Sequence, residues 1–232
     1  MALEETLNER MGRFEAVKGL EIVQAAFRRA MASHQAFKSK AAEVGANKNL
    51  SPFGRTENLR TYVSDEAHQV VRAHKTLARI KAKQDERRAS IQPKSPDKAD
   101  VAGAVARSDL RNMLRGMKMG ERANLLLAKD ADPMLRAAVL ELPNYASGID
   151  DFIRGAVTNA VIEREHPGAL AELEEADAAI EVLEVITQVF TGTAMRLAEL
   201  PTHAALGDFV AKAVGDTARL DADIDRSLSE AA

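Results

Sequence analysis

The chain has 232 residues, of which 46% are hydrophobic and 29% charged, so it can bury a sizeable core and is not an intrinsically disordered protein. It contains no Cys and no Trp, and its seven Phe and two Tyr make up only 4% of the residues. This composition excludes a disulfide scaffold, a cysteine-based zinc site, a Cys nucleophile and an aromatic platform for stacking bases.

The formal net charge of −3 hides a difference between the two parts of the chain. Residues 1–140 contain 26 basic and 17 acidic residues, whereas residues 141–232 contain 6 basic and 18 acidic ones. The two parts can attract each other within one molecule or between neighbouring molecules, and the basic part can also meet an acidic partner. The alternative is a pair of solvated helix faces that differ in sign.

Two long helices are predicted in the first 91 residues. Apolar side chains recur at steps of three and four from Leu3 to Val44, and Gly45 ends this pattern. After a connector, Ser51 and Pro52 predict the start of a second helix that runs to about residue 91. Its seam includes residues spaced by seven, as in a coiled coil. The expected arrangement is an elongated antiparallel hairpin.

Small residues recur every seven positions along the first predicted helix and would return to nearly one face. Gly inside a helix costs about 1 kcal/mol relative to Ala, so close approach of another helix would explain its presence. Chance in an Ala-rich chain is the alternative interpretation. The candidate residues for close helix packing are Gly12, Gly19, Ala26 and Ser33.

A linker with two prolines, residues 92–100, is predicted to separate the hairpin of residues 1–91 from a helical bundle domain of residues 101–232. Asp132 and Pro133 predict a capped helix start within that domain. The later helices are expected at 101–119, 121–129, 133–142, 150–165, 169–199 and 204–229. The fold class is therefore predicted to be all-α.

No motif in the sequence predicts an enzyme, a cofactor or a metal site. The five histidines have no metal-binding spacing, and neither a phosphate-binding glycine loop nor a nucleophile elbow occurs. His34 lies on the apolar stripe of the first predicted helix and is expected to be a packed histidine at the edge of the core. The acidic start of the chain is unlike a secretory signal, so none is predicted. No run of apolar residues is long enough to predict a membrane span.

A basic stripe on the second predicted helix is the strongest interaction feature. It could follow the phosphates of a nucleic acid, which would make binding salt-dependent, but no base-reading module accompanies it. A solvated face or an acidic protein surface is favoured, for example residues 172–184 of another copy. The stripe consists of Arg72, Lys75, Arg79, Lys83 and Arg87.

One part of the sequence resembles a family. In order along the chain it contains Val105-Ala-Arg-Ser-Asp-Leu-Arg-Asn-Met-Leu-Arg115, Met119-Gly-Glu-Arg-Ala-Asn-Leu-Leu, Asp130-Ala-Asp, Ala138-Val-Leu, Pro143 and Ser147-Gly148. Together with Leu50-Ser-Pro-Phe-Gly-Arg55, this order resembles a group of helical proteins encoded by tailed bacteriophages. The resemblance covers about a third of the chain and implies a role in a virion or its assembly, without catalytic residues.

The sequence thus predicts a non-enzymatic structural or assembly protein that acts through helix–helix contacts in a larger complex. Its expected partners are other copies or other assembly proteins, with no membrane and no cofactor. It would be cytoplasmic during assembly and part of the virion in a phage setting. The alternative is a nucleic-acid-associated helical protein that uses the basic stripe, and an enzyme is the weaker third class.

Overall fold

The computed structural model describes residues 3–97 and 99–230, and it confirms the all-α class, because these residues form helices and no strand. One residue of the predicted linker, Lys98, lies outside the described part, as do Met1 and Ala2 of the acidic start. The helices are α1 (Leu3–Gly12), α2 (Glu21–Ala46), α3 (Pro52–Asp65), α4 (Ala67–Ser90), α5 (Val101–Gly116), α6 (Met119–Leu127), α7 (Pro133–Leu140), α8 (Asn144–Ser147), α9 (Asp151–Glu165), α10 (Ala169–Leu197), α11 (His203–Val214) and α12 (Ala218–Glu230).

The chain divides into two compact units. One comprises residues 1–85 and 175–232 and is called here the long-helix unit, and the other comprises residues 86–174 and is called the middle unit. Both α4 and α10 contribute residues to each of them. This division differs from the predicted one, in which the first 91 residues form a hairpin domain of their own.

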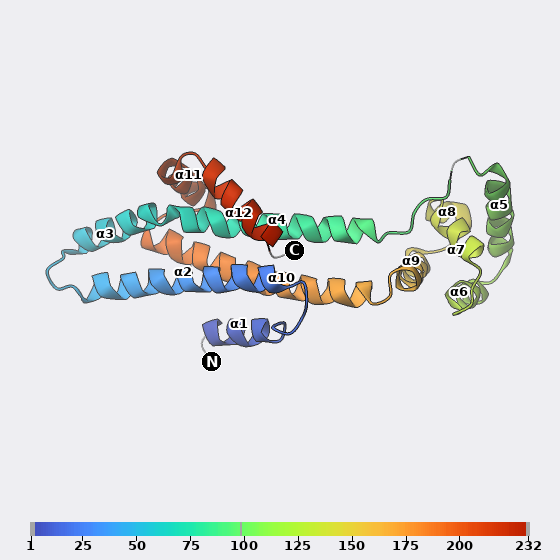
Figure 1. The fold of residues 1–232 in the computed structure, drawn as a ribbon, viewed down its shortest axis with the longest axis horizontal. Helices are drawn as coiled ribbons and strands as arrows, with labels where there is room; N and C mark the ends of the chain where they lie inside the picture. The colour runs from blue at the N-terminus through green and yellow to red at the C-terminus, as the bar shows by residue number, and fades with distance from the viewer. Residues whose placement is uncertain (1–2, 98, 231–232) are drawn as a thin grey trace. The chain divides into compact units, whose positions relative to one another are not determined.

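The reason for the difference lies in the core of the long-helix unit. Figure 1 shows α2, α4 and α10 running alongside one another in this unit. Phe27 of α2, Ile80 of α4 and Leu183 of α10 belong to one buried cluster, which also contains Ile224 of α12. A second cluster joins Phe37 to Phe190, whose ring centroids are 5.0 Å apart. The apolar seam of the N-terminal helices is therefore buried against C-terminal helices of the same chain.

The first predicted helix, 3–44, is broken in the structure. After α1 the chain reverses direction, and Gly19 has a φ of +83°, a conformation that glycine adopts without steric cost. The Gln24 side chain donates to the carbonyl oxygen of Phe14, and Glu4 lies beside His34, so α1 runs back along α2. Both halves of the apolar seam face the same core, which is why the sequence pattern continues through the turn.

Two further predicted helices are also divided. The helix expected over 52–91 consists of α3 and α4 with Glu66 between them, and the helix expected over 204–229 consists of α11 and α12. Gly215, with a φ of +64°, lies in the second break. The predicted helix starts are confirmed, because Ser51 Oγ accepts a hydrogen bond from the Gly54 amide and Asp132 accepts one from Met134.

The middle unit has its own apolar core, and arginine side chains connect its helices through hydrogen bonds. Its apolar centre contains Leu114, Leu126, Val139 and Val157, from four different helices. Arg136 donates to the carbonyl oxygens of Leu126 and Ala128 at the end of α6, at 3.0 and 2.7 Å. Arg154 likewise donates to Val139, Leu140 and Leu142 at the end of α7. These arginines satisfy carbonyl groups that have no partner within their own helix.

Candidate interaction surfaces

The basic stripe of α4 meets acidic residues of α12 in the same chain. Lys75 Nζ lies 2.5 Å from a carboxylate oxygen of Asp221, and Arg79 donates to the same carboxylate at 2.8 Å. Arg79 also lies 2.8 Å from Asp225, and Arg72 lies 3.5 Å from Asp223. Hydrogen bonds from Lys75 and Thr217 lower the pKa of Asp221, and Arg79 adds to the effect.

The rest of the stripe also has partners inside the chain. Lys83 donates to the carbonyl oxygen of Leu228, near the end of α12, and neighbouring Lys81 lies 2.6 Å from Glu184 of α10. Within the middle unit, Arg87 forms an ion pair with Glu172. All five predicted contact residues thus have acceptors within this molecule. Of the possibilities open from the sequence, attraction within one molecule is the one seen here.

The four small residues do not form the predicted close-packing face. Gly12 and Gly19 are exposed, and a Cβ atom added at either position would meet no atom within 4 Å. The physical reason is the chain reversal between α1 and α2, which removes these glycines from the helix that carries Ala26 and Ser33. The other two residues do lie on one side of α2, where they line a cavity.

A buried ion cluster in the middle unit was not predicted from the sequence. Arg107 is only 5% exposed, and its Nε and Nη2 atoms donate to the two carboxylate oxygens of Glu141 at 3.1 and 3.2 Å. Arg111 donates to Glu141 at 2.7 Å, and Arg107 also reaches Asp100 at 3.1 Å. The hydrogen bond from Arg107 lowers the pKa of Glu141, with a further contribution from Arg111.

This cluster gives a structural role to part of residues 105–149, the segment from which the phage setting is predicted. Arg107 and Arg111 lie within that segment, and both donate hydrogen bonds to Glu141. Gly148, near its end, has a φ of +67°, and a Cβ atom there would lie 3.2 Å from Arg122 Nη1. Arg107 and Arg111 are four residues apart and therefore lie on one face of α5, where both reach Glu141. This four-residue step is the sequence feature that could have predicted the cluster.

The middle unit also exposes apolar side chains. Of the eleven large hydrophobic residues that are exposed in the described part of the chain, nine lie in this unit. Three of them are on α5: Val101 is 71% exposed, Val105 59% and Met113 46%. They occupy the side of α5 opposite to its buried Arg107, Arg111 and Leu114. We call these three residues the α5 apolar stripe.

Two further observations bear on the class of protein. Within the described residues, no group of three or more His, Asp or Glu side chains is placed to hold a metal ion. One described helix, α10, is long and apolar enough to cross a membrane by length and composition, but more than half of that stretch is buried inside the protein. Burial of this kind is the ordinary state of a core helix.

Comparisons with family models, with curated proteins and with solved structures find no match for this chain.

Proposed function

We propose that this protein is a non-enzymatic structural or assembly protein that contacts other copies of itself through the α5 apolar stripe. The observation that carries the proposal is the exposure of Val101, Val105 and Met113 on a helix whose opposite side already forms a core. A second apolar face on a small helical unit is a feature of protein–protein contacts. The resemblance to helical proteins of tailed phages makes a phage particle the proposed setting.

The nucleic-acid alternative receives less support from the contacts. A stripe that binds phosphates must present uncompensated positive charge. Here Lys75 and Arg79 share the carboxylate of Asp221, and Arg87 forms an ion pair with Glu172. Protein contact through an apolar surface needs no such charge, and it is the function that we propose.

Light scattering coupled to size-exclusion chromatography tests the proposal on the full chain. We expect wild-type protein to self-associate at both about 0.05 and about 0.5 M NaCl, because salt screens ion pairs but does not weaken apolar burial. The variant V101S/V105S/M113S should elute as a monomer with unchanged helical circular dichroism.

The control is F53S, which removes an exposed aromatic side chain from the long-helix unit, where Phe53 is 76% exposed. It should self-associate like wild type. A wild-type protein that stays monomeric across the concentration range, or a triple variant that still self-associates, would contradict the proposal.

A further inference from the structure

A groove in the long-helix unit has the form of a small binding site. It lies between α2 and α4, with Leu183 of α10 on its floor and residues of α12 at one side, and its cavity volume is about 110 Å³. The space exists because small side chains line it, among them Ala26 and Ala30 of α2 and Ala73 of α4. Every lining residue belongs to the same compact unit.

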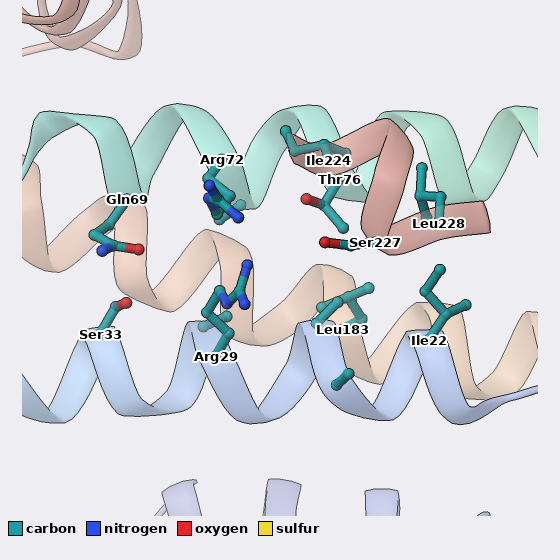
Figure 2. A pocket seen from close by; sticks show the side chains of 14 residues that line it. Ile22, Arg29, Ser33, Gln69, Arg72, Thr76, Leu183, Ile224, Ser227 and Leu228 are labelled. Atoms are coloured by element: carbon teal, nitrogen blue, oxygen red, sulfur yellow. The ribbon is translucent and has the colours of Figure 1, made fainter. Parts of the chain in front are cut away.

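The two ends of the groove differ in polarity. Figure 2 shows Ile22, Leu183 and Leu228 toward one end, and Arg29 and Arg72 on opposite walls toward the other. Ser33 and Gln69 lie beyond the two arginines and add hydrogen-bonding groups to the polar end. A ligand that fits this lining has an apolar part and a polar head.

The charge at the polar end identifies that head as an anion. Arg29 has no hydrogen-bond or ion-pair partner in the described part of the chain, although it lines the groove. Arg72 has an 18% exposed side chain, and its ion pair with Asp223 is long, at 3.5 Å, to a carboxylate that is 45% exposed. Two guanidinium groups thus line the polar end of the groove, and of the two only Arg72 has a carboxylate partner in the described part of the chain. Arg binds carboxylates through parallel N–H donors, and more strongly where water is partly excluded.

The size of the cavity limits the apolar part. An apolar cavity of about 150 Å³ in another protein holds benzene, so the smaller groove accommodates a chain of about four or five carbons. We propose that the groove binds a short aliphatic carboxylate, with its head between Arg29 and Arg72 and its chain along Leu183, Ile224 and Leu228. This site is independent of the proposed self-association, which involves the other unit.

Calorimetric titration of the full chain with hexanoate, hexanol and acetate tests the site. Hexanoate should bind saturably. Hexanol lacks the charge and acetate lacks the aliphatic chain, so each of these two should bind at least about tenfold more weakly than hexanoate. Comparable binding of hexanol and hexanoate would overturn the assigned head group. Absence of saturable hexanoate binding up to about 10 mM, beyond the weak end of useful affinities, would overturn the site.

Matched variants locate the ligand. R29Q should weaken hexanoate binding about tenfold, because it removes a charge-assisted donor. Arg28 is exposed like Arg29 but does not line the groove, so R28Q should leave binding within about twofold. A26L should abolish binding by filling the space beside the chain. Equal effects of R28Q and R29Q would contradict the proposal, as would normal binding by A26L with native circular dichroism.

The same chemistry occurs in a free short-chain acid and at the carboxyl end of a peptide that finishes in an aliphatic residue. Acetyl-leucine and its amide separate the two sources. If acetyl-leucine binds more tightly than hexanoate and its amide does not bind, the site is assigned to a peptide end. If hexanoate binds more tightly than acetyl-leucine, the site is assigned to a free acid. In either case R29Q should weaken the binding of both carboxylates about tenfold.

Discussion

At the residue scale, His34 is a titratable group buried in the long-helix unit. Its exposed fraction is 5%, its Nε2 atom lies 3.2 Å from Glu4, and its Nδ1 atom has no hydrogen-bond partner in the described residues. Burial lowers the pKa of His34 below its ordinary value of 6.5, while Glu4 acts in the opposite direction and Lys38 and Arg196 add to the lowering. The neutral imidazole is thus the form that the folded protein prefers.

This preference predicts a stability change in mild acid. Because the pKa of His34 is lower in the folded than in the unfolded chain, the unfolded chain binds more protons below pH 6.5, and folding stability falls as the pH is lowered from about 7 to about 5. His74 acts in the same direction, since partial desolvation of its ring lowers its pKa too. Urea unfolding across this range should show a shallower decline for H34Q than for wild type. The control H166Q, at an exposed position, should follow wild type, and an equally steep decline in H34Q would refute the assignment.

At the scale of the element, the pairing of α12 with α4 explains where the basic charge goes. Asp221, Asp223 and Asp225 lie at alternate positions of α12 and contact Arg72, Lys75 and Arg79 of α4. The apolar side of the same helix is buried through Ile224 and Leu228. The two contributions are separable, because neutral amides at the three aspartates leave the apolar packing in place.

The triple variant D221N/D223N/D225N should therefore gain affinity for nucleic acid. Freeing three basic side chains creates a phosphate-binding stripe, so double-stranded DNA should be retained at about 0.05 M NaCl and released at about 0.2 M. The control E15Q/E57Q/D208N changes the net charge equally at exposed positions and should bind no more DNA than wild type. Fluorescence anisotropy measures both. Wild-type protein that binds as well as the triple variant would show that internal pairing does not block the stripe.

The elements also show how far sequence patterns predict this fold. The helical class and the capped helix starts at Ser51 and Asp132 depend on local chemistry, and both are visible in the sequence. The reversal at Gly19 is not, because an apolar seam continues across it when both arms face one core. The role of α12 as the main partner of the basic stripe was not predicted for a related reason: a charge pattern shows the sign of a partner but not the helix that supplies it.

At the scale of the whole molecule, the chain order predicts that the middle unit can be removed. The long-helix unit is interrupted between residues 85 and 175, and the side-chain amide of Gln84 donates to Asp177 at 2.9 Å across this interruption. Two helix positions this close can be joined by a connection of about two to eight residues. A variant with a short Gly/Ser linker in place of residues 86–174 should thus fold, with cooperative thermal unfolding and strong helical circular dichroism.

The same variant separates the contributions of the two units to function. It retains Arg29 and Arg72 and should bind hexanoate like the full chain, but it lacks the α5 apolar stripe and should be monomeric in light scattering. A folded variant that still self-associates would place the contact surface in the long-helix unit and contradict the proposed function. A variant that fails to fold would show that this core depends on the middle unit, because Gln84 and Asp177 alone would then not hold the ends of α4 and α10 together.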